Sequence, residues 1–208
     1  MNTHQTPFIA IEGPIGVGKT SLSLLVSEAL GYSLLKEIVY ENPFLESFYE
    51  NIDTWGFQTE MFFLVNRYLQ LEDIQKNYIE KAKPVVADYH IFKNLLFADM
   101  NLHPDKFSKF QKIYHTLIDG LLQPNLLIVI NASLDTLKHR INIRSRDFEE
   151  LIEDEYLEKL IIEYDAYATL FELEHPDIPV LRINGDHVDF VNSPDDLKKI
   201  IEQIKELL

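Results

Sequence analysis

Residues 13–20 read Gly-Pro-Ile-Gly-Val-Gly-Lys-Thr, a complete G-x-x-x-x-G-K-S/T pattern. The apolar run 8–11 precedes this pattern, and a stretch with helical spacing follows it at 21–30. A strand, a glycine loop and a helix in this order let backbone N–H groups wrap a phosphate at the positive end of a helix. The competing explanation is a glycine turn with a chance Lys-Thr, and the flanking strand and helix count against it. The pattern therefore predicts binding of a nucleoside triphosphate.

The residue types in this loop predict separate roles. Lys19 supplies a mobile ammonium group for the β- and γ-phosphates, and the hydroxyl of Thr20 is placed to bind Mg²⁺. The expected cofactors are therefore ATP and Mg²⁺. The predicted nucleotide-binding residues are Gly13, Pro14, Ile15, Gly16, Val17, Gly18, Lys19, Thr20 and Ser21.

Apolar runs and helical spacing alternate along the chain, which is typical of a parallel sheet with crossover helices. The predicted strands are 8–12, 32–36, 84–88, 126–131 and 180–184. Helices are predicted over 20–30, 54–81, 134–144, 154–174 and 194–207, with two more carrying the apolar residues of 92–96 and 107–117. We expect one α/β domain over 1–208, a five-stranded parallel sheet flanked by helices in the manner of a P-loop kinase.

Composition excludes several classes of protein. The formal charge is −15, from 19 Lys and Arg against 34 Asp and Glu, and such a field repels nucleic-acid polymers. The absence of cysteine excludes disulfides, thiolate metal sites and cysteine nucleophiles. No apolar run is long enough for a membrane helix, and the polar start lacks a signal-peptide core, so we expect a cytoplasmic protein with a small second substrate and no membrane partner.

Carboxylates follow two of the predicted strands. Asp88 closes the run 85–87 and is expected to bind Mg²⁺, to cap the following helix, or to do both. Glu37 follows the second strand and should face the glycine loop, because ligands in open α/β sheets lie beyond the carboxyl ends of the strands. A glutamate there can orient or deprotonate an attacking hydroxyl, although position alone equally allows a surface residue.

Basic residues cluster after the fourth strand. Arg140 and Arg144 are four residues apart and share a helix face, and Arg146 follows them. Such arginines can close over a triphosphate and stabilise charge on the transferred phosphoryl group, as an arginine-bearing lid over about 140–155. The alternative is a surface patch that pairs with the acidic residues of 147–150.

Taken together, these features resemble the deoxynucleoside kinase family over nearly the whole chain. The motifs are GPIGVGKTS at 13–21, LLKEIV at 34–39, WGFQTE at 55–60, Asp88, HRINIRSR at 139–146 and EYLEKL at 155–160. The resemblance implies phosphorylation of a deoxynucleoside at its 5′-hydroxyl with ATP. It also implies a homodimer, for which the apolar helices around 55–74 and 107–122 are candidates, although the same faces could be core.

The resemblance also implies roles for individual residues. Glu37 resembles the general base, and Gln58 the glutamine that reads the nucleobase. Tyr49 and Glu155 resemble the pair that holds the sugar 3′-hydroxyl, while Arg140, Arg144 and Arg146 match the lid arginines. The aromatic residues that resemble those sandwiching the base are Trp55, Phe62 and Phe92, although a core role is as reasonable for the last two.

The chain departs from the family pattern after the third strand. Family members usually carry Asp/Glu-Arg-Ser there, whereas this chain has Asp88-Tyr89-His90. Tyr89 has no charge to replace the arginine, and His90 would contribute only if it were protonated. We expect another basic group to compensate, with Arg67 as the best candidate. The alternative is a differently arranged site in a purine-specific branch.

A second departure concerns the base. Pyrimidine-preferring relatives carry an aspartate where this chain has Asn94. Two amides, Gln58 and Asn94, would suit the mixed donor and acceptor edge of guanine. This favours deoxyguanosine over deoxyadenosine.

Other functions remain open alongside a deoxyguanosine kinase. The chain could be a deoxyadenosine or deoxycytidine kinase. A nucleoside monophosphate kinase would need a second set of arginines, yet Arg67 is the only arginine between the glycine loop and Arg140. A slowly hydrolysing regulatory protein is the remaining alternative, and a guanine-selecting Asn-Lys-x-Asp run is absent.

Overall fold

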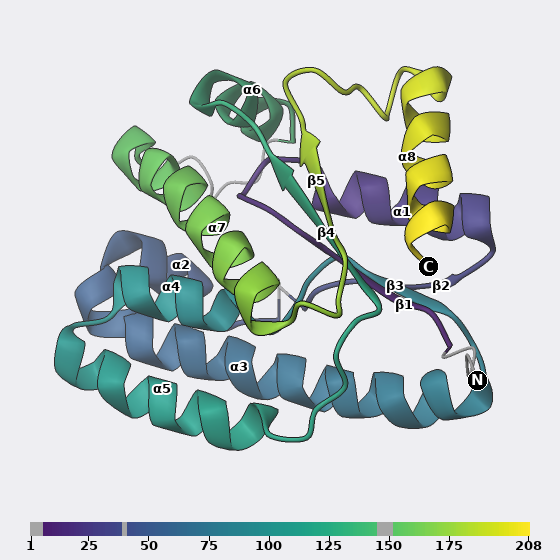
Figure 1. Cartoon of the computed structure of the whole chain (residues 1–208). Helices are drawn as coiled ribbons and strands as arrows, with labels where there is room; N and C mark the ends of the chain where they lie inside the picture. Colours follow the sequence, from purple (N-terminus) through teal and green to yellow (C-terminus); the bar gives the residue numbers. More distant parts are fainter. Residues whose placement is uncertain (1–5, 39–40, 145–151) are drawn as a thin grey trace.

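A computed structural model describes residues 6–38, 41–144 and 152–208. Its centre is a five-stranded parallel sheet with the strand order β2-β3-β1-β4-β5 (Figure 1). The strands are β1 (Phe8–Glu12), β2 (Ser33–Leu35), β3 (Val85–Ala87), β4 (Leu126–Asn131) and β5 (Val180–Asn184). The five predicted strands and the α/β fold class are confirmed.

The strand order places the ends of three strands at one crevice. β1 lies between β3 and β4, with Ala10 in register with Ala87 on one side and Leu127 on the other. β2 lies beyond β3, so the chain runs outward from β1 to β2, returns to β3, and then crosses β1 once to reach β4. Ligands of open parallel sheets bind at such a reversal of strand order, beyond the carboxyl ends. The glycine loop, which follows β1, lies at that edge.

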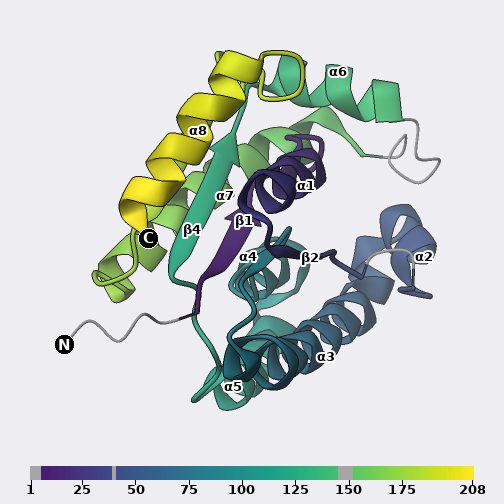
Figure 2. The same ribbon diagram turned by 90° about the vertical axis from the view of Figure 1, so that its right-hand side faces the viewer.

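Helices cover both faces of the sheet (Figures 1 and 2). One face carries α1 (Lys19–Leu30) and α8 (Pro194–Leu207). The other face carries a helical layer of α3 (Ile52–Asn77), α4 (Lys93–Asn101), α5 (Pro104–Ile118) and α7 (Asp154–Glu174). The remaining helices are α2 (Leu45–Glu50), the 3₁₀ helix η1 (Ile79–Lys81) and α6 (Leu134–Arg144).

The two faces of the sheet have different cores. Phe8 and Ala10 of β1 belong to the core under the helical layer, while Ile9 and Ile11 belong to the core under α1 and α8. Because successive side chains of a strand point to opposite faces, a strand covered on both sides reads as an unbroken apolar run. This is why β1 and β4 were recognisable in the sequence.

The helices differ from the expectation at their ends. The predicted helix 54–81 begins earlier, because Asn51 caps it by accepting a hydrogen bond from the Thr54 N–H at 2.9 Å. It also ends at Asn77, and η1 follows before the left-handed turn at Ala82. The short helix α2 was not predicted. Within the described ranges, no helix is long and apolar enough to cross a membrane.

Candidate active site

The glycine loop packs tightly against its neighbours. Gly13 has φ +151°, and a Cβ there would lie 2.2 Å from the Ile130 carbonyl oxygen. Gly16 has φ +82°, and a Cβ there would lie 2.7 Å from a side-chain carbon of Ile141. Only glycine fits at both positions, and the loop therefore holds its backbone in the conformation that a phosphate cradle requires.

Lys19 lies across this loop. Its Nζ donates hydrogen bonds to the carbonyl oxygens of Gly13 at 2.7 Å and Pro14 at 3.1 Å. Burial and the charge of Lys93 lower the pKa of Lys19 to about 8, against the opposing pull of nearby carboxylates. The ammonium group is still mostly charged at neutral pH, and the N-terminus of α1 lies beside it. These groups fit the triphosphate of ATP.

Asp88 connects the glycine loop to the end of β2. Its Oδ2 accepts a hydrogen bond from the Thr20 hydroxyl at 2.8 Å, and its Oδ1 accepts one from the Glu37 N–H at 2.6 Å. The next helix, α4, begins only at Lys93, so the expectation that Asp88 caps it is wrong. A hydroxyl and a carboxylate side by side are hard oxygen donors, which fit Mg²⁺.

Glu37 is held by two cations. Its Oε1 accepts hydrogen bonds from the Nε of Arg67 at 3.1 Å and from the Nη2 of the same guanidinium, and Lys93 Nζ lies 3.0 Å from the carboxylate. Burial alone would favour the neutral acid, but the charges of Lys93 and Arg67 outweigh it and lower the pKa of Glu37 to about 2. Glu37 is therefore ionised at neutral pH.

These contacts place two positive charges beside Glu37, in a chain that lacks the arginine expected after the third strand. Arg67 reaches Glu37, as expected, and Lys93 is a second cation that sequence reasoning missed. Tyr89 is wholly buried, and the described residues offer its hydroxyl no partner. Burial lowers the pKa of His90 to about 3, so its ring is uncharged at neutral pH and supplies no positive charge.

Glu12, the last residue of β1, is a buried acid that the sequence reasoning also missed. Its Oε1 accepts a hydrogen bond from the His90 N–H at 2.6 Å, and its Oε2 accepts one from the Tyr164 hydroxyl at 3.1 Å. Lys93 Nζ lies 3.7 Å from Glu12 and thus joins it to Glu37. Burial raises the pKa of Glu12, although Lys93 and Lys19 oppose the rise. The rule that singled out Asp88, a carboxylate at a strand end, would also have found this residue.

A cavity of about 360 Å³ opens from the glycine loop into the helical layer. This is the size of a small-molecule site, and its walls combine aromatic rings with a few polar groups. The predicted site residues on its wall are Ile15, Lys19, Thr20, Glu37, Tyr49, Arg67, Asp88 and Arg144. The wall residues that sequence reasoning missed are Lys36, Leu45, Phe48, Thr59, Glu60, Phe63, Lys93, Phe97, Tyr156 and Tyr164.

Six predicted substrate-binding residues are not part of this wall. Gln58 and Glu155 are exposed, Asn94 is wholly buried, and Phe62 lies beside the wall residue Phe63. Trp55 stacks on Phe44, with ring centroids 6.0 Å apart, and Phe92 packs against Phe171 at 5.9 Å. Neither amide of the two-amide interpretation reaches the cavity.

Gln58 and the wall residues of α3 lie on different faces of this helix. The wall residues Glu60, Phe63 and Arg67 are spaced by three and four, so they lie on one side of the helix. Gln58 is two residues from Glu60 and therefore points elsewhere. A search for polar residues in helical register with Arg67 would have found Glu60.

The lid arginines are placed only in part. Arg140 donates hydrogen bonds to the carbonyl oxygens of Val17 and Gly185, both at 2.8 Å, and so bridges the glycine loop and the end of β5. Arg144 lies on the cavity wall. Arg146 lies outside the described residues, as does the lid segment 145–151.

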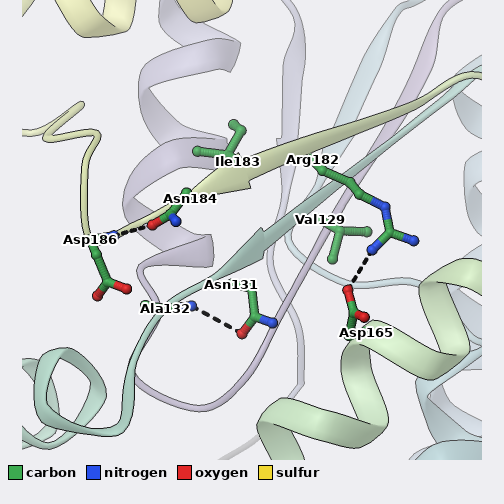
Figure 3. Close-up of a pocket in the computed structure, with 8 residues that line it drawn as sticks. All are labelled: Val129, Asn131, Ala132, Asp165, Arg182, Ile183, Asn184 and Asp186. Carbon is green, nitrogen blue, oxygen red and sulfur yellow. Dashed lines mark hydrogen bonds and ion pairs between the residues drawn. The ribbon is translucent and has the colours of Figure 1, made fainter.

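A second hollow lies between the ends of β4 and β5 and helix α7 (Figure 3). Its one guanidinium, from Arg182, is bonded to Asp165 at 2.7 Å and to Glu172 at 2.9 Å. No residue of the glycine loop lines it. The hollow is a place where an ion pair joins α7 to β5, and the cavity at the glycine loop remains the candidate active site.

Comparisons with known proteins agree with this geometry. The family model described as deoxynucleoside kinase matches residues 9–208. A deoxyguanosine kinase of Bacillus subtilis (strain 168) is 49% identical over 208 residues, which cover 100% of both chains. A deoxyadenosine kinase of Lactobacillus acidophilus is 32% identical and covers 96% of this chain and 95% of its own.

Among solved structures, the deoxyadenosine kinase of M. mycoides with the products dCMP and a flexible dCDP bound has a TM-score of 0.81. The match covers 97% of this chain and 100% of that one at 24% identity, and it supports the fold. The glycine loop, the strand-end carboxylates and the cavity beside them thus occur in a chain whose relatives are named deoxynucleoside kinases. The protein belongs to the deoxynucleoside kinase family.

Proposed function

We propose that this enzyme transfers the γ-phosphoryl group of ATP to the 5′-hydroxyl of a purine deoxynucleoside, with deoxyguanosine preferred. The observation that carries the proposal is Glu37, ionised between Arg67 and Lys93 on a cavity wall that begins at the glycine loop. The preference for deoxyguanosine is supported by the 49% identity to the Bacillus subtilis enzyme. The alternatives within the family are deoxyadenosine and deoxycytidine.

In this proposal, Glu37 accepts a hydrogen bond from the 5′-hydroxyl and aims its oxygen at the phosphoryl group. A carboxylate with so low a pKa is a weak base, so its main contribution is orientation, with the proton taken up late in the transfer. When bound, ATP with Mg²⁺ supplies the phosphoryl group and the metal charge. Lys19, the glycine-loop N–H groups and the arginines Arg140, Arg144 and Arg146 stabilise negative charge, while Thr20 and Asp88 hold the metal.

The same contacts argue against a nucleoside monophosphate as acceptor. Lys19, Lys36 and Arg144 also line the cavity, but the two cations that the helical layer contributes to its wall, Arg67 of α3 and Lys93 of α4, both pair with Glu37. A phosphate on the acceptor would have to compete with that carboxylate. An uncharged nucleoside does not.

The proposal extends to the organisation of the protein. One catalytic domain over 1–208 with a lid at about 140–155 would act in the cytoplasm, without a nucleic-acid polymer or a membrane as partner. A homodimer is supported by exposed apolar side chains on the helical layer, Val65 and Leu69 on α3 and Ile113 on α5. Sedimentation equilibrium tests it, and a monomer at micromolar concentration would contradict it.

The enzymatic test uses the purified protein with ATP and Mg²⁺ and offers deoxyguanosine, deoxyadenosine, deoxycytidine, thymidine and deoxyguanosine monophosphate in parallel. We expect a 5′-monophosphate from deoxyguanosine at the highest kcat/KM. Preferred turnover of another deoxynucleoside would overturn the base assignment. Phosphorylation of the monophosphate alone would overturn the proposed function.

A further inference from the structure

Besides Glu37 and Asp88, the cavity wall carries a third carboxylate, which lies on the helical layer. Glu60 of α3 lies on its wall and is 3% exposed. It precedes Arg67 by seven residues, which is two helical turns and roughly 10 Å along the helix axis. Arg67 marks the reacting end through its contact with Glu37. The span from Glu37 to Glu60 therefore suits a nucleoside, with the 5′-hydroxyl at one end and the far edge of the base at the other.

Aromatic rings lie between the two carboxylates. Phe63 is one turn from Glu60, and the guanidinium of Arg67 lies 4.7 Å from the centroid of its ring. Phe97 of α4 is also on the wall, with Lys93 Nζ 6.0 Å from its centroid. Flat apolar walls of this kind accept a planar base, and the edge of that base can then form hydrogen bonds with a polar group on the wall.

Glu60 is held in place but keeps acceptor capacity. The Nδ2 of Asn101 donates a hydrogen bond to its Oε1 at 3.0 Å, and the Oδ1 of Asn101 accepts one from the Tyr156 hydroxyl at 3.3 Å. Asn101 is the one donor to this carboxylate among the described residues, whereas a carboxylate can accept about four hydrogen bonds. Beside it, the buried hydroxyl of Thr59 has no partner in the described part of the chain.

We propose that Glu60 selects the base, by accepting the N1–H and N2–H hydrogen bonds of guanine at the part of the cavity wall that lies two helical turns along α3 from Arg67. The inference rests on the proposed function and names the residue that decides its substrate. An ionised carboxylate only accepts hydrogen bonds, and guanine presents two adjacent donors on its Watson–Crick edge. Adenine and cytosine present a ring-nitrogen acceptor there, which would face a carboxylate oxygen without a proton between them.

The protonation of Glu60 makes this selection depend on pH. Burial raises the pKa of Glu60 to about 7, although the Asn101 hydrogen bond and the charges of Arg67 and Lys93 oppose the rise. The protonated acid can donate to the N1 of adenine and accept from its amino group, so lower pH favours adenine. The titratable and charged groups that face Glu60 from α3, α2, α4 and α7 are Arg67, Tyr49, Lys93 and Tyr156.

The test compares wild type with Glu60→Gln, using deoxyguanosine, deoxyinosine and deoxyadenosine. Glutamine has the same shape and still accepts from Asn101, so the variant is expected to fold. We expect kcat/KM for deoxyguanosine to fall about a hundredfold, and the ratio of deoxyguanosine to deoxyadenosine to fall further, because two charge-assisted bonds are lost and an amide can serve adenine. Deoxyinosine lacks N2–H, and its disadvantage against deoxyguanosine should shrink in the variant.

Two matched variants sharpen the result. Glu72→Gln alters a partly exposed glutamate of the same helix that does not line the cavity, and it should leave all the ratios unchanged. Gln58→Ala removes the amide that the sequence pattern favoured. If Gln58→Ala changes the deoxyguanosine-to-deoxyadenosine ratio and Glu60→Gln does not, the proposal is overturned. Such a result would leave the kinase function intact, whereas a wild-type protein inactive on every deoxynucleoside would overturn the function itself.

Wild type alone supplies an independent measurement. The ratio of kcat/KM for deoxyguanosine to that for deoxyadenosine should rise severalfold between pH 6 and pH 8, as Glu60 loses its proton. In Glu60→Gln the ratio should stay constant over this range. A wild-type ratio that does not change with pH would count against the proposal.

Discussion

Glu37, which is partly buried, and Glu60, which is fully buried, lie on the wall of one cavity, yet their pKa values move in opposite directions. At the reacting end, Arg67 and Lys93 contact Glu37 and lower its pKa to about 2. Two turns along α3 from Arg67, Glu60 is hydrogen-bonded only to the neutral amide of Asn101 among the described residues, and burial raises the pKa of Glu60 to about 7. The same residue type thus becomes a permanent anion in one place and a titrating acid in the other.

The difference shows that burial alone does not decide the charge of a side chain. Desolvation acts against ionisation at both glutamates, and the nearest partner decides whether it prevails. Pairs of groups whose pKa values are driven apart commonly carry different roles in a site. Here we assign orientation of the hydroxyl to Glu37 and recognition of the base to Glu60.

Loss of the permanent anion should have the largest effect. We expect Glu37→Gln to lower kcat about a thousandfold, because the neutral amide loses both the charge-assisted hydrogen bond that orients the hydroxyl and the carboxylate that takes up its proton late in the transfer. Steady-state assays measure this, with Glu46→Gln on the exposed side of α2 as the control. A fall of less than threefold would show that Glu37 is not part of the reaction.

The opposite pKa shifts should appear in separate pH windows of stability. Glu37, with its lowered pKa, stabilises the fold above the ordinary value of 4.5, and this contribution is lost as pH falls towards 2. Glu60, with its raised pKa, stabilises the fold below 4.5, and this contribution is lost as pH rises through 7. Each contribution is about 3 kcal/mol, at 1.36 kcal/mol for each unit of pKa.

Chemical denaturation of wild type, Glu37→Gln and Glu60→Gln across pH 3 to 8 measures these windows. The difference in unfolding free energy between wild type and Glu60→Gln should change between pH 4.5 and 7. The difference for Glu37→Gln should change below pH 4.5. If the unfolding free energies of the two variants depended on pH in the same way, the pKa values of Glu37 and Glu60 would not be shifted in opposite directions.

Removal of Lys93 should make the surroundings of Glu37 less positive and therefore more like those of Glu60. In Lys93→Met, Glu37 keeps Arg67 but loses one positive neighbour, so its pKa should rise and the acidic limb of the kcat/KM profile should move to higher pH. We expect about a tenfold loss of kcat/KM at pH 7. Lys76→Met, at an exposed position of α3, is the control, and an unmoved acidic limb would exclude this role for Lys93.

The smallest effect is expected at the exposed ion pairs of Arg182. Its contacts with Asp165 and Glu172 are as short as those inside the cavity, but water screens them. Arg182→Met should lower the unfolding free energy by at most about 1 kcal/mol and leave the kinetics unchanged. Thermal melts test this prediction. A loss of several kcal/mol would mean that an exposed ion pair contributes as much to the unfolding free energy as a buried one.

Local patterns predicted much of this molecule. The unbroken apolar runs of β1 and β4 are visible because both faces of those strands are covered, and the glycine loop is visible because Gly13 and Gly16 allow no side chain. Asp88 and Glu37 were found because strand ends meet at one edge of a parallel sheet. Arg67 was found by asking what replaces a missing charge.

The rest of the site depends on helix rotation. Gln58 and Glu60 are two residues apart, and the sequence pattern favoured the one that proves to be exposed. Lys93 and Asn101 lie on α4, and their contacts with Glu37 and Glu60 join segments that are far apart in the chain. No local pattern determines such contacts, because they depend on how α4 packs against α3.

By itself, then, the sequence determined the sheet, the phosphate cradle and the acid at the reacting end, since each is encoded within a few neighbouring residues. Only the tertiary structure decided that Lys93 accompanies Arg67 and that Glu60 lies on the wall of the cavity. The physical reason is that the pKa and the partners of a buried charge are set by its surroundings, and these are assembled from α3, α4 and α7.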